Sequence, residues 1–74
     1  MEKVEINTEF ITLGQLLKII NITDSGGASK YYLASHPNDF NINNEKENRR
    51  GKKLYPNDIV KIKDFGEFKI VNVS

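Results

Sequence analysis

The sequence predicts an α+β fold in which two short helices pack on a small, strongly twisted antiparallel sheet. An alternating apolar and polar segment opens the chain, two helical patterns follow, and the second half holds several alternating segments separated by turns. The chain has 74 residues, which allows a single domain over residues 1–74. A domain of this size buries only about 60% of the surface that its unfolded chain exposes, so a deep cavity is not expected.

The first strand is expected at residues 3–7, where apolar and polar residues alternate. A capping box follows: the Thr12 hydroxyl is placed to accept from the Gln15 amide, and the Gln15 side chain to reach back to the Thr12 amide. The first helix should therefore begin at Leu13 and last about two or three turns, although Gly14 weakens it. The residues expected on its apolar face are Leu13, Leu16, Leu17 and Ile20.

The second helix is expected to begin at Gly26 or Gly27, with Ser25 as its N-cap. It should end at His36, because Pro37 disfavours the helical conformation in the residue before it. The residues expected on its apolar face are Ala28, Tyr32 and Leu33.

The second half of the chain is expected to form antiparallel strands joined by tight turns. Residues 40–42 alternate, and Asn43-Asn44 can adopt the positive φ of a two-residue type I′ turn, which would return the chain along residues 45–48. The sequence Tyr55-Pro56-Asn57-Asp58 is typical of another turn. The strands expected to complete the sheet are residues 59–63 and 68–73, separated by the turn DFGE.

The charge of the chain is unevenly distributed. Its formal net charge is only +1, yet residues 46–53, here called the basic segment, contain five cations and one acid. The remaining residues contain six lysines and nine acids. An acidic body with one basic patch is expected to attract a polyanion in one orientation, because the local potential steers association.

Four cations of the basic segment surround Gly51 in the sequence RRGKK. Arginine can bind phosphate through two parallel hydrogen bonds, lysine adds a compact charge, and glycine permits a close approach of the backbone. We expect these side chains to bind nucleic-acid phosphates. There are two alternatives: the segment is a solvated loop without a partner, or it binds an acidic protein or a membrane surface. The four residues are Arg49, Arg50, Lys52 and Lys53.

Other chemistry finds little support in the sequence. There is no cysteine, His36 is the only histidine, and the acids are scattered over turns and strand ends. We therefore expect no enzyme activity, no metal site, no cofactor and no small-molecule substrate. The polar N-terminus is unlike a signal peptide and the longest apolar stretch is too short to span a bilayer, so we expect a cytoplasmic monomer without membrane contact.

The order of these elements, together with the sequences TLGQLLKIINITDSGGASKYYL, FNINNE and ENRRGKKLYPNDIVKI, resembles the alpha-L RNA-binding domain first described in small-subunit ribosomal protein S-four. Within that family the chain is most similar to the short stand-alone bacterial members of the YaaA type. The resemblance runs from about Glu9 to Lys63. It implies non-catalytic binding of structured RNA, which is either ribosomal RNA or transfer RNA, and it implies the ribosome as a candidate partner. The RNA-binding face that it implies is formed by the two helices and the loop before the later strands. The RNA-binding residues that it implies are Lys18, Ser25, Lys30, Arg49, Arg50, Lys52 and Lys53.

The chain also departs from the family pattern. Gly26 stands where many members have an arginine, and Ser29 where they have a small apolar residue. Asn44 and Asn57 replace glycines that are usual in two turns, and we expect those turns to survive because asparagine tolerates positive φ.

Two questions remain open from the sequence. The alternative function is a protein-interaction module that docks its basic edge on an acidic partner, such as a replication, repair or ribosome-associated factor. The three tyrosines are candidates either for the core or for stacking on bases. Tyr32 lies on the inner helical face, Tyr31 lies nearer the exposed side, and Tyr55 adjoins the basic segment.

Overall fold

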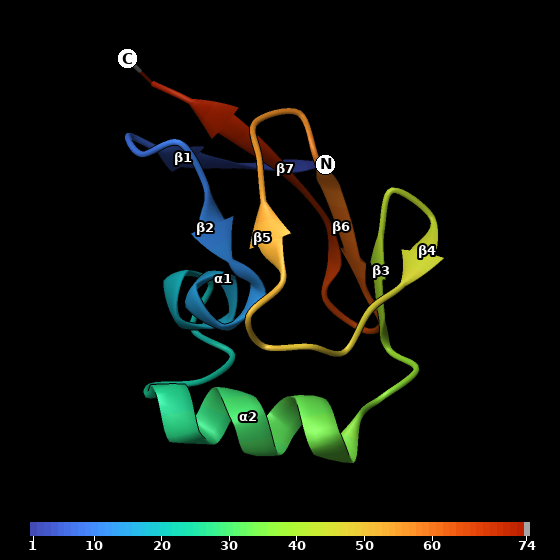
Figure 1. Cartoon of the computed structure of the whole chain (residues 1–74). Coiled ribbons are helices and arrows are strands. Elements are labelled where there is room, and N and C mark those ends of the chain that lie inside the picture. The colour runs from blue at the N-terminus through green and yellow to red at the C-terminus, as the bar shows by residue number, and fades with distance from the viewer. Residues whose placement is uncertain (74) are drawn as a thin grey trace.

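The computed structural model describes residues 1–73 and shows an α+β fold with two short helices, which confirms the predicted class (Figure 1). Residue 74, which the predicted domain includes, lies outside the described residues. The helices are α1 (Leu13–Ile19) and α2 (Gly26–Ser35). The strands are β1 (Glu2–Ile6), β2 (Ile11–Thr12), β3 (Phe40–Ile42), β4 (Glu45–Lys46), β5 (Lys53–Leu54), β6 (Ile59–Ile62) and β7 (Gly66–Asn72).

Five of these strands form one mixed sheet in the order β1-β7-β6-β3-β4. Strand β6 pairs antiparallel with both β3 and β7, and β3 pairs antiparallel with β4. The prediction of a wholly antiparallel sheet is wrong for β1, which runs parallel to β7 with Glu2 opposite Phe68 and Ile6 opposite Asn72. Alternation of apolar residues shows which face of a strand is buried but not its direction, and the long connection between β1 and β7 permits the parallel arrangement.

A second, two-stranded sheet was not predicted. Strand β2 pairs antiparallel with β5, so that Ile11 lies opposite Leu54 and Thr12 opposite Lys53. This pairing places the end of the basic segment directly beside the start of α1 (Figure 1).

The core lies between the helices and the sheet. In α1 the side chains of Leu13, Leu16 and Leu17 are fully buried, as predicted, whereas Ile20 is only partly buried. Helix α2 contributes Leu33. The core residues from the strands and their ends are Val4, Ile6, Ile11, Phe40, Ile42, Leu54, Val60, Ile62, Phe68 and Ile70.

The contact between the two helices includes Ser29, a fully buried side chain that the prediction of an apolar face missed. Its Oγ lies 2.7 Å from Thr23 Oγ1, 3.2 Å from the Gly14 carbonyl oxygen and 3.1 Å from the Ser25 carbonyl oxygen. The hydroxyl is therefore satisfied within the core, and it connects α2 to the backbone of α1.

The predicted turns are present. Asn43 and Asn44 have φ of 51° and 71°, and Asn57 has φ of 79°, as expected because asparagine tolerates positive φ. Asn43 does more than turn the chain, because its Nδ2 donates to Asp58 Oδ1 at 3.0 Å and its Oδ1 accepts from the Ile59 amide at 3.0 Å. The side chain thus ties the β3–β4 hairpin to the start of β6.

This difference between two adjacent asparagines leads to a first prediction. The substitution Asn44→Gly should change the free energy of unfolding little, because glycine tolerates the same φ and Asn44 makes no side-chain hydrogen bond within residues 1–73. Asn43→Gly should lower it by about 1–2 kcal/mol, because both hydrogen bonds of the Asn43 side chain are lost. Urea denaturation of the two variants measures this, and equal losses would show that the cross-links do not contribute.

Candidate nucleic-acid interface

The backbone of the basic segment is attached to the first turn of α1. The Leu13 amide donates to the Lys52 carbonyl oxygen at 2.8 Å, and the Gly14 amide donates to the Arg50 carbonyl oxygen at 2.9 Å. The predicted capping box is also present: Thr12 Oγ1 accepts from the Gln15 amide and Gln15 Oε1 accepts from the Thr12 amide. The first amides of α1 are therefore satisfied by protein groups, and this helix end is closed to an external anion.

The side chain of Arg50 lies across Gly14 and extends to the start of α2. A Cβ atom at position 14 would lie only 2.5 Å from Arg50 Cγ, so any larger residue there requires the arginine side chain to shift. Arg50 Nη1 donates to the Gly26 carbonyl oxygen at 3.2 Å. Arg50 was predicted to bind phosphate, and it also joins the first turns of the two helices. Nothing local in the sequence indicates this contact, because Gly14 and Arg50 are far apart along the chain.

Arg49 is held by a neighbouring acid of the same segment. Its Nε donates to Glu47 Oε2 at 2.9 Å, its Nη2 donates to Oε1 at 3.0 Å, and its backbone amide also donates to Oε2 at 3.0 Å. These bonds lower the pKa of Glu47 from its ordinary value of 4.5 to about 2 and raise the pKa of Arg49. The Arg49 side chain stays 74% exposed, whereas that of Glu47 is only 12% exposed, so the arginine presents its remaining donors to solvent.

The other end of the segment carries a small aromatic cluster. Lys53 Nζ lies 4.9 Å from the centre of the Phe10 ring, close enough for a cation–π contact. The Phe10 and Tyr55 rings lie 5.7 Å apart at an angle of 46°. Beside this cluster is a shallow hollow of about 590 Å³, here called the Tyr55 hollow, which is lined by Arg49, Gly51, Lys52, Lys53 and Tyr55.

The structure gathers only some of the predicted RNA-binding residues. Three of the four cations around Gly51 line the Tyr55 hollow, and the fourth, Arg50, turns toward α2. Ser25 is the N-cap of α2, as predicted, and its Oγ accepts from the Ala28 amide at 3.1 Å. Lys30 is exposed on α2, and Lys18 is exposed near the end of α1 beside a separate hollow that also includes Asp24. Neither lysine lines the Tyr55 hollow.

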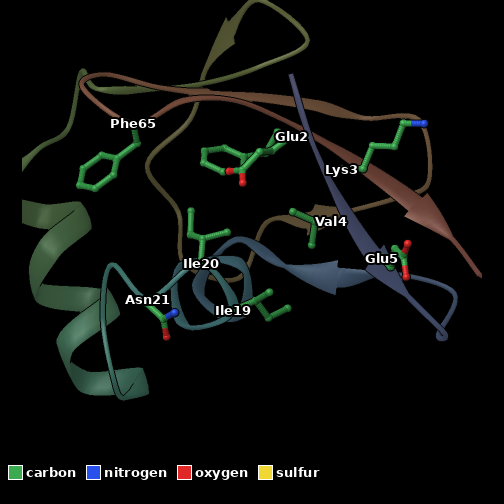
Figure 2. A pocket seen from close by; sticks show the side chains of 9 residues that line it. Glu2, Lys3, Val4, Glu5, Ile19, Ile20, Asn21 and Phe65 are labelled. Carbon is green, nitrogen blue, oxygen red and sulfur yellow. The ribbon is translucent and has the colours of Figure 1, made fainter.

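A different hollow, of about 460 Å³, lies between β1 and the end of α1 (Figure 2). Phe65 and Ile20 lie across from Val4 in this hollow, whereas the Lys3 side chain points away from it. With Glu2 and Glu5 as its acidic residues and one lysine, the hollow does not offer the cations that a phosphate would require.

Within residues 1–73, no group of three histidine, cysteine, aspartate or glutamate side chains is arranged to hold a metal ion. No helix in the described part of the chain is long and apolar enough to cross a membrane.

The close packing of Arg50 on Gly14 predicts an energetic coupling between the two positions. Gly14→Ala should lower the free energy of unfolding by about 1–3 kcal/mol, because the new methyl group displaces the arginine side chain. In an Arg50→Ala background the same change should be neutral or stabilising by up to about 1 kcal/mol, since alanine favours the helix. Gly27→Ala, where a Cβ would meet nothing within 4 Å, is the matched control and should not be destabilising. An equal effect of Gly14→Ala in both backgrounds would contradict the packing.

The Arg49–Glu47 pair predicts a pH effect. Because the folded-state pKa of Glu47 lies below its ordinary value, the pair stabilises the fold fully above about pH 4.5, and this contribution is lost as the pH falls toward 2. NMR titration of the glutamate carboxyl carbons should show Glu47 titrating well below the other glutamates. In Arg49→Gln its pKa should return toward 4.5. Ordinary titration of Glu47 in the unsubstituted protein would show that the pair does not form in solution.

Comparison with known proteins places the chain in a family. The sequence model described as the S4 domain matches residues 4–71. The probable ribosome maturation protein RlbA of Bacillus subtilis (strain 168) is 48% identical over 69 residues, which cover 93% of this chain and 94% of that protein. The resemblance inferred from about Glu9 to Lys63 is thereby confirmed and extended to β1 and β7. The chain belongs to the S4 domain family.

Proposed function

We propose that this protein binds structured RNA without catalysing a reaction, and that the basic segment binds the phosphates of the RNA backbone. The observation that supports this most strongly is the placement of Arg49, Lys52 and Lys53 around one open hollow on a segment anchored to α1. The relative from Bacillus subtilis is named for ribosome maturation. Ribosomal RNA is therefore our first candidate for the bound RNA, ahead of transfer RNA, and a cytoplasmic monomer is the form in which we expect the protein to act.

The anchoring of the basic segment supports binding as well as stability. Cations crowded into a few residues repel one another, and the backbone bonds from Leu13 and Gly14 hold them together before any RNA arrives. Less conformational entropy is then lost on binding than for a mobile basic tail. Because the rest of the chain is acidic, the same cations also determine which face meets the RNA.

RNA suits this surface better than DNA. Helix α2 has ten residues, and Lys30 is its only cation, so it lacks the basic face of a helix that lies in a DNA major groove. The cations instead lie on a loop and a strand end, which can follow the irregular phosphate ridges of folded RNA. Specificity would then arise mainly from shape.

Salt dependence tests this proposal. If about four to six phosphates are neutralised, log affinity for a ribosomal RNA fragment should fall against log salt concentration with a slope of roughly −3 to −5. Lys52→Ala and Lys53→Ala should each weaken binding and reduce the slope by about 1. Lys61→Ala is the control, because Lys61 is exposed but lies on β6 and does not line the Tyr55 hollow.

A flat salt response, or an equal effect of Lys61→Ala, would contradict phosphate binding by the basic segment. Sedimentation with ribosomes distinguishes the alternative partner. Co-sedimentation that persists after complete digestion of the RNA would indicate that the basic segment docks on an acidic protein instead.

A further inference from the structure

We propose that the Tyr55 hollow binds a single unpaired nucleotide of the RNA, with its base stacked on the Tyr55 ring and its phosphates held by the surrounding cations. This inference rests on the proposed RNA-binding function and specifies the feature of the RNA that the site recognises. An unpaired nucleotide, unlike one within a duplex, can turn its base out of the helix and stack it on a protein ring.

The hollow has the size and the openness for such a ligand. Its volume of about 590 Å³ lies within the range of roughly 300–1,000 Å³ that is typical of small-ligand sites. Gly51 contributes only backbone to the lining, and a Cβ atom there would meet nothing within 4 Å. The space at this Cβ position is therefore open, and a ligand can approach the Gly51 backbone closely there.

The Tyr55 ring is held in place before any ligand binds. Its backbone amide donates to Asp58 Oδ2 at 2.8 Å, and its ring packs on Phe10. The residue is nevertheless 42% exposed and lines the hollow, so a part of the ring is free to stack. A ring fixed in this way loses little further freedom when a base stacks on it.

The cations lie where the phosphates of a stacked nucleotide would need them. Lys53 and Tyr55 flank the fully buried Leu54, so the alternation of an extended chain places both side chains on the outer side. The contact of Lys53 Nζ with Phe10 brings this charge to the same aromatic pair that supports Tyr55. Arg49 completes the arrangement with the donors that Glu47 does not occupy.

The lining also indicates how selective the site is. Apart from the Gly51 backbone, the lining is cationic or aromatic, and we assign its cations to the phosphates. No asparagine, glutamine, aspartate or glutamate side chain lines the hollow to read a base edge. Stacking accepts any base, so the site should respond to the presence of an unpaired base and only weakly to its identity.

Three RNA hairpins of otherwise identical sequence test the proposal: one fully paired, one with a single bulged adenine, and one with an abasic bulge at the same place. The protein should bind the adenine bulge roughly 5- to 100-fold more tightly than the other two, the advantage of one stacked base. Tyr55→Phe should keep this preference, and Tyr55→Leu should remove it while leaving the salt dependence unchanged. Tyr31→Leu is the control, because Tyr31 is 77% exposed on α2 and does not line the hollow.

Equal binding of all three hairpins with a steep salt dependence would overturn this inference and leave the proposed function standing. Equal preference for the adenine and abasic bulges would overturn it as well, because flexibility rather than a base would be recognised. Loss of the preference in Tyr31→Leu, and not in Tyr55→Leu, would place the stacking surface on α2. Failure to bind any RNA would overturn the proposed function together with this inference.

Discussion

The fold and the candidate site both depend on the attachment of the basic segment to the first turn of α1. This helix has only seven residues, and isolated helices of that length are not stable in water. The carbonyl oxygens of Lys52 and Arg50 accept from its first two amides, while the capping box satisfies the next. The same bonds hold a highly charged segment that has little apolar surface of its own. The basic segment therefore supplies acceptors for the first amides of α1, and α1 supplies the attachment that fixes the backbone of the basic segment.

The attachment also assigns separate tasks to residues that look equivalent in the sequence. Arg50 packs on Gly14 and bonds to the backbone of α2, whereas Arg49 pairs with Glu47 and stays largely exposed. Lys52 and Lys53 line the Tyr55 hollow. One of the four cations around Gly51, Arg50, thus also contributes to the arrangement of the helices. The other three make no such contact, and we propose that they form the main part of the electrostatic surface toward the RNA.

Local features were predictable because their causes lie within a few residues. The capping box at Thr12, the N-cap at Ser25 and the turn at Asn43-Asn44 all follow from nearby side chains, and the structure confirms them. The parallel pairing of β1 with β7 and the contact of Arg50 with Gly14 join distant parts of the chain, and no local pattern carries that information. The Arg49–Glu47 pair is a local feature that was nevertheless not predicted. An acid two residues before an arginine could have been recognised from the sequence.

We infer that the basic segment is fixed in place before RNA binds. The decisive measurement is amide hydrogen exchange of Leu13 and Gly14, followed by NMR in the free protein, because these two amides donate to the segment. Both amides should exchange as slowly as the amides of β6 and β7, with little change when RNA is added. Exchange at the rate of an unprotected loop in the free protein, with protection only after RNA is added, would contradict it.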